Sequence, residues 1–582
     1  MPQKTFKRKV PFSGKAKKEQ LKTKKQSKQG PILLQSLEDK EQSSSSIQKT
    51  NFQPTKDIRS KSNRYALQFF RESNEEIAKQ KEVARQSLEA KTEKDLEVDG
   101  DIFFDEVLDF PKRPPWDFEL SKSRLEAQEN KYFTNYVDKI VQQFEGKDLS
   151  LFELNLETWR QLWRVLEMSD IILFIVDIRF PVLLFPPSLY HYVTGTLKKD
   201  FILVLNKIDL APASLVVAWK SYFQDKYPDL HIVMFTTLPG YNLVGKQSNN
   251  EGMQVRRKRG RIRMAAEGTQ QLFDICKKLV KDEVDLSSWQ SKIKEELEEE
   301  YIDNDVENLE IGETVQLKNV DTHYQQYEKF NKGILTIGCV GQPNVGKSSL
   351  MNAVMGRKVV SVSKTPGHTK HFQTIFLTPN VRLCDCPGLV FPSKVPRPLQ
   401  VLMGSYPIAQ LRQPYITIKY LAERLDLVSM LRIEHPYQED TWSAMDICDG
   451  WAKKRGYLTA KTAHFDSYRA ANSLLRMALD GKICLCLRPP SYTENKEYWI
   501  SHPEVKTVKW IQARSPEDEV TEKFVPYESD TSDCENIVGD DKVVGQDSDN
   551  EDEEDSECSE DSGDDEGNFI GTNKFAPLGP DE

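Results

Sequence analysis

Short runs of apolar residues alternate with segments of helical length through the middle of the chain. Three such runs, 171–176, 201–205 and 231–235, come early, and a fourth, 334–340, follows about a hundred residues later. Runs that are apolar at nearly every position are typical of strands buried on both faces, and intervening helices are typical of a parallel sheet. The pattern therefore predicts an α/β fold built on a parallel sheet.

Helical periodicity flanks the predicted sheet. Apolar residues recur at steps of three and four over 119–144 and again over 159–167, which predicts two amphipathic helices. A charged helix is expected within 63–85. Between these elements, residues 109–116 (DFPKRPPW) form an aromatic, proline-rich arm that must pack on something.

The chain changes character after the fourth run. Two further strands are expected at 372–377 and 381–384, and residues 400–515 return to helical spacing, with one short strand at 483–487. Residues 240–330 interrupt the pattern and contain one expected helix at 270–281. We interpret them as a partly disordered insertion.

Charge is distributed unevenly along the 582 residues, of which 29% are charged, with a net charge of -10. The first 28 residues carry eleven Lys or Arg, whereas residues 547–566 carry thirteen Asp or Glu. Such ends cannot bury enough apolar surface to offset the entropy of ordering. The expected organisation is a disordered basic tail (1–60), a helical arm and linker (61–154), the α/β domain (155–400), a mainly helical domain (401–515) and a disordered acidic tail (516–582).

The charged segments suit partners of opposite charge. The basic cluster of the N-terminal tail and a second basic segment, 256–263, fit RNA phosphates or a nuclear-import signal, and the acidic tail fits basic proteins. Solvated segments without a partner remain the alternative for each. Four serines within the acidic tail are hypothetical phosphorylation sites: Ser548, Ser556, Ser559 and Ser562.

Cysteine usage and hydropathy point to a reduced intracellular compartment. The nine cysteines are scattered, several lie inside apolar runs, and their spacing favours buried thiols over metal ligands. Because no apolar run reaches about 18 residues and the N-terminus lacks an apolar core, we expect neither a membrane span nor secretion.

A glycine-rich loop follows the fourth apolar run. Residues 341–349 read GQPNVGKSS and lead into a helix. Strand, glycine loop and helix form the context of a phosphate-binding loop, whose backbone N–H groups surround phosphate oxygens. Lys347 would reach the β- and γ-phosphates, and Ser348 would bind Mg²⁺.

The second apolar run ends in Asn206-Lys207-Ile208-Asp209. A carboxylate at Asp209 can accept hydrogen bonds from N1–H and N2–H₂ of guanine, while Lys207 covers the ring and Asn206 ties loops together. Adenine lacks these two donors, so the wrong base would leave the carboxylate unpaired. At the end of the third run, Thr236 and Thr237 either approach the guanine carbonyl or simply end a strand.

The strand at 381–384 ends in Asp385-Cys386-Pro387-Gly388, where the carboxylate can hold Mg²⁺ and the Gly388 N–H can bind the γ-phosphate. Thr369 is the first choice for a switch threonine on Mg²⁺ and Thr365 the second. The candidate catalytic residues are Lys347, Thr369, Gly388 and Asn344, and the candidate metal ligands are Ser348, Thr369 and Asp385. The candidate nucleotide-binding residues are Asn206, Lys207, Ile208, Asp209, Gly341, Gln342, Pro343, Asn344, Val345, Gly346, Lys347, Ser348, Ser349, Asp385, Cys386, Pro387, Gly388 and Leu389.

These motifs occur in an unusual order. An ordinary GTPase begins with the phosphate loop and reaches the N-K-x-D element late, whereas here N-K-x-D precedes the loop and the Asp-x-Pro-Gly turn comes last. Joining the usual ends and cutting the chain after that turn gives this order. The sequence predicts a circularly permuted P-loop GTPase domain.

Over about 155–470 the sequence resembles the permuted GTPase family that includes nucleostemin and the ribosome-assembly GTPases. Segments 11–15 (PFSGK), 109–116, 155–169 and 360–368 carry a closer likeness to one branch of that family. The resemblance implies binding of GTP and GDP, slow hydrolysis and a role on a pre-ribosomal particle in large-subunit biogenesis. Together with the basic N-terminal cluster, it leads us to expect a location in the nucleus or nucleolus, with shuttling to the cytoplasm left open.

Two residues bear on the mechanism. Leu389 stands where many signalling GTPases carry a water-orienting Gln, so the intrinsic rate should be low until another group acts. In similar GTPases an Asn at the position of Asn344 helps to bind K⁺, which makes K⁺ a candidate cofactor. The alternative to this nucleotide switch is a scaffold in which the nucleotide is structural and the tails recruit partners. A small-molecule kinase is disfavoured because N-K-x-D specifies guanine.

Overall fold

A six-stranded sheet organises the part of the chain that the structure describes. The computed structural model describes residues 74–105, 108–116, 121–144, 149–237, 266–298, 328–357, 359–360, 373–459 and 463–513. All of them belong to one unit of the chain, Met1–Pro516. The strands are β1 (Ile171–Asp177), β2 (Asp200–Asn206), β3 (His231–Met234), β4 (Leu335–Val340), β5 (Gln373–Thr378) and β6 (Val381–Asp385).

The strands lie in the order β3-β2-β1-β4-β6-β5, and every neighbouring pair is parallel except β5 with β6. In the centre β1 pairs with β4 in a register that sets Ile171 opposite Ile337. Every residue of β1 and β4 is buried, as expected for strands covered on both faces. The sheet therefore has the predicted parallel character, and its six strands each lie within two residues of the bounds that the sequence predicted.

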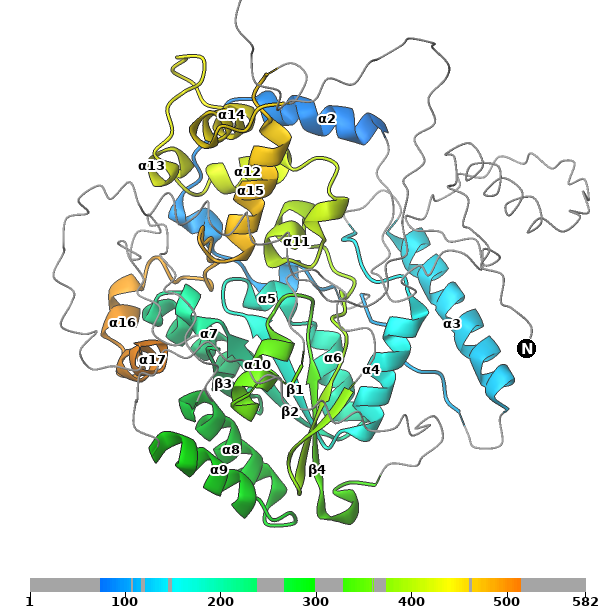
Figure 1. Ribbon diagram of the computed structural model, residues 1–582. Coiled ribbons are helices and arrows are strands. Elements are labelled where there is room, and N and C mark those ends of the chain that lie inside the picture. Colours follow the sequence, from blue (N-terminus) through cyan, green and yellow to red (C-terminus); the bar gives the residue numbers. More distant parts are fainter. Residues whose placement is uncertain are drawn as a thin grey trace, which may run out of the picture. The chain divides into compact units, whose positions relative to one another are not determined.

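Helices cover both faces of this sheet. Figure 1 shows α4 and α6 on one side of the strands and α8 and α10 on the other. The helices are α2 (Asn74–Arg85), α3 (Lys122–Gln143), α4 (Leu156–Met168), α5 (Pro181–Leu184), α6 (Pro187–His191), α7 (Ala213–Lys226), α8 (Ala266–Val280), α9 (Ser287–Glu298), α10 (Lys347–Met355), α11 (Arg397–Met403), α12 (Tyr415–Ala422), α13 (Leu427–Leu431), α14 (Ala444–Arg455), α15 (Ser467–Leu479), α16 (Lys496–Ser501) and α17 (Glu504–Ala513).

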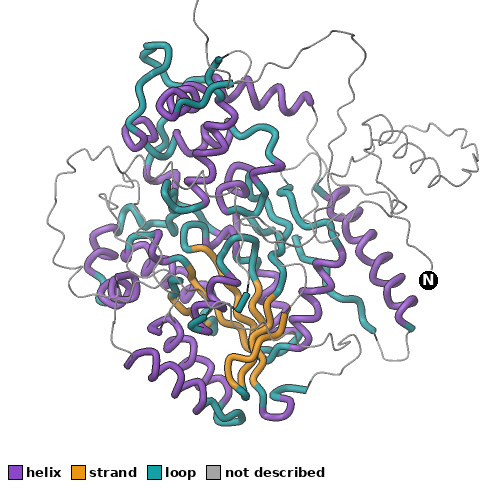
Figure 2. Tube along the Cα trace, in the orientation of Figure 1, coloured by secondary structure: helices purple, strands orange, loops and turns teal. Residues whose placement is uncertain are grey.

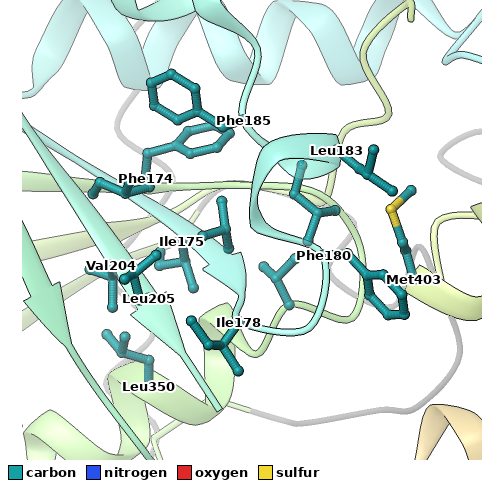
Figure 3. Packing of buried hydrophobic residues seen from close by; sticks show 14 of the residues in the cluster. Phe174, Ile175, Ile178, Phe180, Leu183, Phe185, Val204, Leu205, Leu350 and Met403 are labelled. Carbon is teal, nitrogen blue, oxygen red and sulfur yellow. The ribbon is translucent and has the colours of Figure 1, made fainter. Parts of the chain in front are cut away.

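The main core lies between these layers. Side chains from β1, β2, α10 and α11 form one buried cluster, part of which Figure 3 shows from Phe174 of β1 to Met403 of α11. The cluster continues into α12, α14 and α15. One hydrophobic core therefore joins the sheet to the helices that follow it.

The segment interpreted as an insertion contributes to this core. Within 240–330 the structure describes 266–298 and 328–330; the first range contains α8 and α9, and the expected helix at 270–281 corresponds to α8. Phe273 of α8 and Trp289 of α9 are fully buried with their rings 5.4 Å apart at 89°. These two helices are therefore part of the α/β fold. Residues 256–263, with their basic cluster, lie outside the described residues.

The proline-rich arm packs on the sheet domain, as the sequence required. Phe110 is buried, stacks on Trp159 of α4 at 6.5 Å and meets Phe391 edge-on at 6.1 Å. The indole of Trp163 donates a hydrogen bond of 2.7 Å to the carbonyl of Pro111. The predicted helices at 119–144 and 159–167 are confirmed as α3 and α4.

The helices α11 to α15, joined by loops, follow the sheet, as Figure 2 shows, and confirm that this region is mainly helical. The N-terminal helix α2 packs against α12 and α14 of this region. The predicted strand at 483–487 is wrong. Although Ile483, Leu485 and Leu487 are buried, these residues do not pair in a strand ladder; the Leu487 N–H instead donates to the carbonyl of Arg179 at 2.9 Å.

Described cysteines other than Cys484 are buried thiols, in agreement with the expected core role. In the part of the chain that the structure describes, no helix has the length and apolar composition needed to cross a membrane.

Candidate functional site: a guanine-nucleotide site at the carboxyl edge of the sheet

The phosphate loop connects β4 to α10 through a conformation that needs glycine. Gly346 has φ of 98°, in the left-handed region, and a Cβ there would lie 2.5 Å from the Nδ2 atom of Asn206. Asn344 also lies in the left-handed region, at φ 59°. Because the loop turns tightly into the N-terminus of α10, its N–H groups and the helix dipole favour an anion at this point.

Lys347 is held at the phosphate loop by backbone carbonyls. Its ammonium donates to the carbonyls of Gly341 at 3.0 Å and Gln342 at 2.8 Å, and the side chain is buried. Burial lowers the pKa of Lys347, against the opposing attraction of Asp385. An ammonium held by backbone carbonyls can exchange them for phosphate oxygens, with which it forms stronger, charge-assisted hydrogen bonds.

Ser348 and Asp385 fit a magnesium ion. The Ser348 hydroxyl donates to Oδ2 of Asp385 at 3.3 Å, whereas Oδ1 of the same buried carboxylate has no hydrogen-bond partner. Burial raises the pKa of Asp385 to about 6, an effect that Lys347 and Ser348 oppose. A buried carboxylate oxygen without a donor, beside a serine hydroxyl, matches the oxygen ligands that Mg²⁺ prefers. Bound Mg²⁺ would neutralise charge on the phosphates and hold them in place.

The N-K-x-D residues meet the phosphate loop, although the two motifs lie far apart in the sequence. Asn206 Nδ2 donates to the carbonyl of Val345 at 2.8 Å. Lys207, in the left-handed conformation, donates through Nζ to the carbonyl of Asn344 at 2.7 Å. The predicted role of Asn206 in tying the loops together is thus visible in the geometry.

Asp209 lies in a short 3-10 turn, Ile208–Leu210, directly after β2. It is buried, and its Oδ1 accepts a hydrogen bond of 2.7 Å from the hydroxyl of Thr236. Thr236 therefore orients the carboxylate that would read the base. The sequence offered two other roles for this threonine and did not anticipate this one.

The structure adds Asp177 and Arg179, which the sequence analysis did not single out. Asp177 ends β1 fully buried, and its carboxylate accepts from Nε and Nη2 of Arg179 at 3.1 and 2.9 Å and from Nζ of Lys207 at 2.8 Å. Nη1 of Arg179 donates a hydrogen bond of 2.7 Å to the carbonyl of Ala478. The signal in the sequence is an acid and a base, two residues apart, at the end of a buried apolar run.

The Asp-Cys-Pro-Gly turn follows β6 and lies against the phosphate loop. The Cys386 N–H donates to the Cys339 carbonyl at 3.2 Å, and a Cβ on Gly388 would lie 2.8 Å from Cα of Pro343. Leu389 is fully buried in the hydrophobic core, and its N–H donates to the Gly341 carbonyl at 3.4 Å. A side chain in that place cannot orient a water molecule.

Two side chains of the phosphate loop contact the end of α11. Oε1 of Gln342 accepts a hydrogen bond of 2.7 Å from the Ser405 hydroxyl, and both side chains are buried. Nδ2 of Asn344 donates to the carbonyl of Gly404 at 3.0 Å. The loop is therefore in direct contact with the first helix of the helical region.

The candidate residues are gathered in one place, with two exceptions. The loop residues, the N-K-x-D residues and the Asp-Cys-Pro-Gly turn lie at the carboxyl ends of β2, β4 and β6, which is where α/β sheets bind ligands. Thr365 and Thr369 lie outside the described residues, as do the four serines of the acidic tail.

Comparison with known proteins agrees with this site. A family model described as "50S ribosome-binding GTPase" matches residues 336–445. Guanine nucleotide-binding protein-like 1 of Homo sapiens is 49% identical over 488 residues, which cover 80% of this chain and 80% of that protein. The Mus musculus protein of the same name is 48% identical with the same coverage.

More distant relatives are also found. Large subunit GTPase 1 of Schizosaccharomyces pombe is 35% identical over 72% of this chain and 63% of its own length. The crystal structure of GNP-bound YlqF from T. maritima matches 57% of this chain and 98% of its own at 16% identity, with a TM-score of 0.33, which is too low to establish a shared fold. On the identity and coverage of the first relatives, the chain belongs to the guanine nucleotide-binding protein-like 1 family of circularly permuted GTPases.

Proposed function

We propose that this protein binds GTP with Mg²⁺, hydrolyses it slowly and acts as a nucleotide-dependent switch in the assembly of the large ribosomal subunit. One observation carries most weight: Asn206 and Lys207 bond to the carbonyls of Val345 and Asn344, so guanine recognition and phosphate binding share one site. The printed names of a large subunit GTPase and a 50S ribosome-binding family support the ribosomal part.

In this proposal the chemistry is slow because the chain lacks a group that orients the attacking water. Leu389 is buried away from the site, and Lys347 supplies the fixed positive charge. A charge added by a partner is worth roughly 10³ to 10⁵ in rate in other GTPases. The intrinsic rate of hydrolysis is then low because the site lacks this group, and a partner that supplies it determines when GTP is hydrolysed.

A bound K⁺ ion is the proposed source of part of the additional positive charge that speeds hydrolysis. The Asn344 side chain already lies at the loop, with its Nδ2 atom engaged by Gly404. We expect hydrolysis to be faster in K⁺ than in Na⁺ at equal ionic strength, and Asn344→Ala to abolish the difference. Full K⁺ stimulation of the variant would remove Asn344 from this role.

The switch would act on the helical region through two connections. Residues after Leu389 lead directly into α11, and Gln342 and Asn344 hold the end of that helix at Ser405 and Gly404. A change at the phosphate loop therefore reaches α11 through side chains as well as through the chain. Thr369, on Mg²⁺, is the proposed switch threonine that senses the third phosphate.

In this proposal the protein consists of a basic tail (1–60), a helical arm and linker (61–154), the GTPase domain (155–400), a mainly helical domain (401–515) and an acidic tail (516–582). The basic segments, 1–28 and 256–263, would bind RNA of the pre-ribosomal particle, and the acidic segment 547–566 would bind basic proteins. We place the protein in the nucleus and nucleolus on this basis.

The test is single-turnover GTP hydrolysis by the full chain, with and without large ribosomal subunits or their precursors. Acceleration by the particle, lost in Lys347→Ala, would support the switch. Tight GTP binding without turnover under any condition would instead favour the scaffold, in which the nucleotide is structural; deletion of 1–60 should then abolish particle binding while Lys347→Ala has no effect.

A further inference from the structure

The turn that carries Asp209, Ile208–Leu210, is called here the guanine-recognition turn. Its backbone contacts the C-terminal part of the described chain. We call residues 481–513, which follow α15 and include α16 and α17, the C-terminal segment. Both helices pack against α7, and Lys220 of α7 forms an ion pair of 2.8 Å with Glu504 of α17. The Trp219 indole donates to the carbonyl of Leu487 at 3.1 Å.

Gln512 of α17 makes the most direct contact with the turn. Its Nε2 atom donates to the carbonyl of Ile208 at 2.6 Å and to the carbonyl of Ala211 at 2.9 Å. The side chain is 8% exposed, and both residues that accept its bonds are fully buried. One amide group thus uses both of its N–H donors on carbonyls that lie on either side of Asp209.

Two further contacts fix the residue between those carbonyls. The Cys486 thiol donates to the carbonyl of Leu210 at 3.6 Å. Gly481, at φ 72°, lies so close to Leu210 that a Cβ on it would be 2.7 Å from the Leu210 Cδ2 atom. The carbonyls of Ile208, Leu210 and Ala211 are therefore all engaged by the C-terminal segment.

This support matters because the base is read by one carboxylate. Asp209 must present two oxygens to two donors of guanine, and its Oδ1 already accepts from Thr236. A hydrogen-bonded site of this kind discriminates strongly only while its geometry is held. Without Gln512, the Ala211 carbonyl would lose this donor and the Ile208 carbonyl would keep the Ala211 N–H at 3.3 Å, so the turn would shift to recover the lost hydrogen bonds.

We propose that Gln512 is a positioning residue for guanine recognition: through the carbonyls of Ile208 and Ala211 it sets the place of Asp209, and the C-terminal segment thereby controls base specificity. The inference rests on the proposed binding of guanine nucleotide. It adds a residue, distant in sequence from every nucleotide motif, on which the choice of base depends.

The experiment compares affinities for GDP and for inosine diphosphate, which keeps N1–H but lacks the 2-amino group. Gln512→Met keeps the length of the side chain and removes both donors. We expect the preference for GDP over inosine diphosphate, measured by isothermal titration on the full chain, to fall about tenfold. Lys506→Met, on the exposed face of the same helix, is the matched control and should leave the preference unchanged.

Further variants separate positioning from stability. Gln512→Asn retains the amide on a shorter side chain and serves where Gln512→Met does not fold; it should show a smaller fall. In an Asp209→Asn background, Gln512→Met should cause no additional fall. Equal weakening of both nucleotides, or an unchanged preference in a folded variant, would overturn the positioning role.

The wild-type protein provides the last distinction. Failure of the wild-type chain to bind GDP, or equal affinity for GDP and ADP, would refute guanine recognition itself and the role of Gln512 with it. Normal selectivity in the wild-type chain, with unchanged selectivity in Gln512→Met, would refute only the role of Gln512.

Discussion

Replacing Asp177 by Asn should destabilise the protein strongly, because it leaves buried cations without their partner. The carboxylate is fully buried and accepts hydrogen bonds from Arg179 and Lys207. Burial by itself disfavours the charged carboxylate, but the attraction of Arg179 and Lys207 outweighs this and holds the pKa of Asp177 well below its usual range. The pair is therefore ionised throughout the physiological range.

The magnitude follows from the burial of both charges. Arg179 is 2% exposed, so after Asp177→Asn its guanidinium would face a neutral amide with little access to water. Removing one partner of a buried ion pair typically costs about 3–5 kcal/mol. That is a large share of a total free energy of unfolding of about 5–15 kcal/mol.

Urea unfolding of the nucleotide-free protein measures this cost. A double-mutant cycle compares the wild type with Asp177→Asn, Arg179→Met and the double variant. The double variant should lose less free energy of unfolding than the two single variants combined, because it leaves neither Asp177 nor Arg179 as an unpaired charge. Glu494→Gln serves as control, since its ion pair with Lys94 is more than half exposed on both sides and should change stability by less than about 0.5 kcal/mol.

A loss below about 1 kcal/mol for Asp177→Asn, or strictly additive losses in the cycle, would refute the reasoning that this pair is a coupled, desolvated unit.

Three more predictions concern the metal, the loop and the core. Because burial raises the Asp385 pKa from 3.8 to about 6, the native state binds this proton more tightly than the unfolded state. Without Mg²⁺, the free energy of unfolding of the wild type should therefore fall by up to about 3 kcal/mol as pH rises from about 4 to 6. Asp385→Asn should lack this decline in urea unfolding with a chelator present, and parallel pH profiles of the two proteins would contradict the prediction. Gly346→Ala should weaken GDP binding at least about tenfold by titration, since its Cβ would meet Asn206 at 2.5 Å; unchanged affinity would mean that the loop rearranges freely. Trp289→Ala should lower the free energy of unfolding by about 3–5 kcal/mol in the same assay, whereas Trp510→Ala, at a half-exposed residue, should lower it by less than about 0.5 kcal/mol. Similar losses for both variants would show that α9 is not part of the core.

The strands of the sheet and the nucleotide motifs were predictable because both depend on local sequence. A strand buried on both faces is apolar at nearly every position, so β1 and β2 stand out without knowledge of their neighbours. The loop at 341–349 and N-K-x-D carry their chemistry in adjacent residues. Their meeting, through Asn206 and Val345, followed from the order of the motifs.

Other features depend on partners that no local pattern identifies. The apolar residues Ile483, Leu485 and Leu487 look like a strand, yet the backbone of Leu487 bonds to Arg179 and Trp219 instead of to a neighbouring strand. Gln512 is an ordinary residue of an amphipathic helix until α17 is placed on α7. Only the tertiary structure gives such residues a role.

The pairing of β1 with β4 has a consequence for how the protein is made. On the ribosome β1, β2 and β3 emerge first, and one edge of β1 then lacks its neighbour until synthesis passes Leu335. At about 5–20 residues per second, the chain between Met234 and Leu335 takes roughly 5–20 s to synthesise. During it the half of the sheet that reads the base exists without the half that binds phosphate, and an apolar strand edge is open to wrong partners. We therefore expect the nascent chain to expose that edge late in synthesis of the domain, whereas a GTPase with its phosphate loop at the start of the domain would expose a different edge at a different stage.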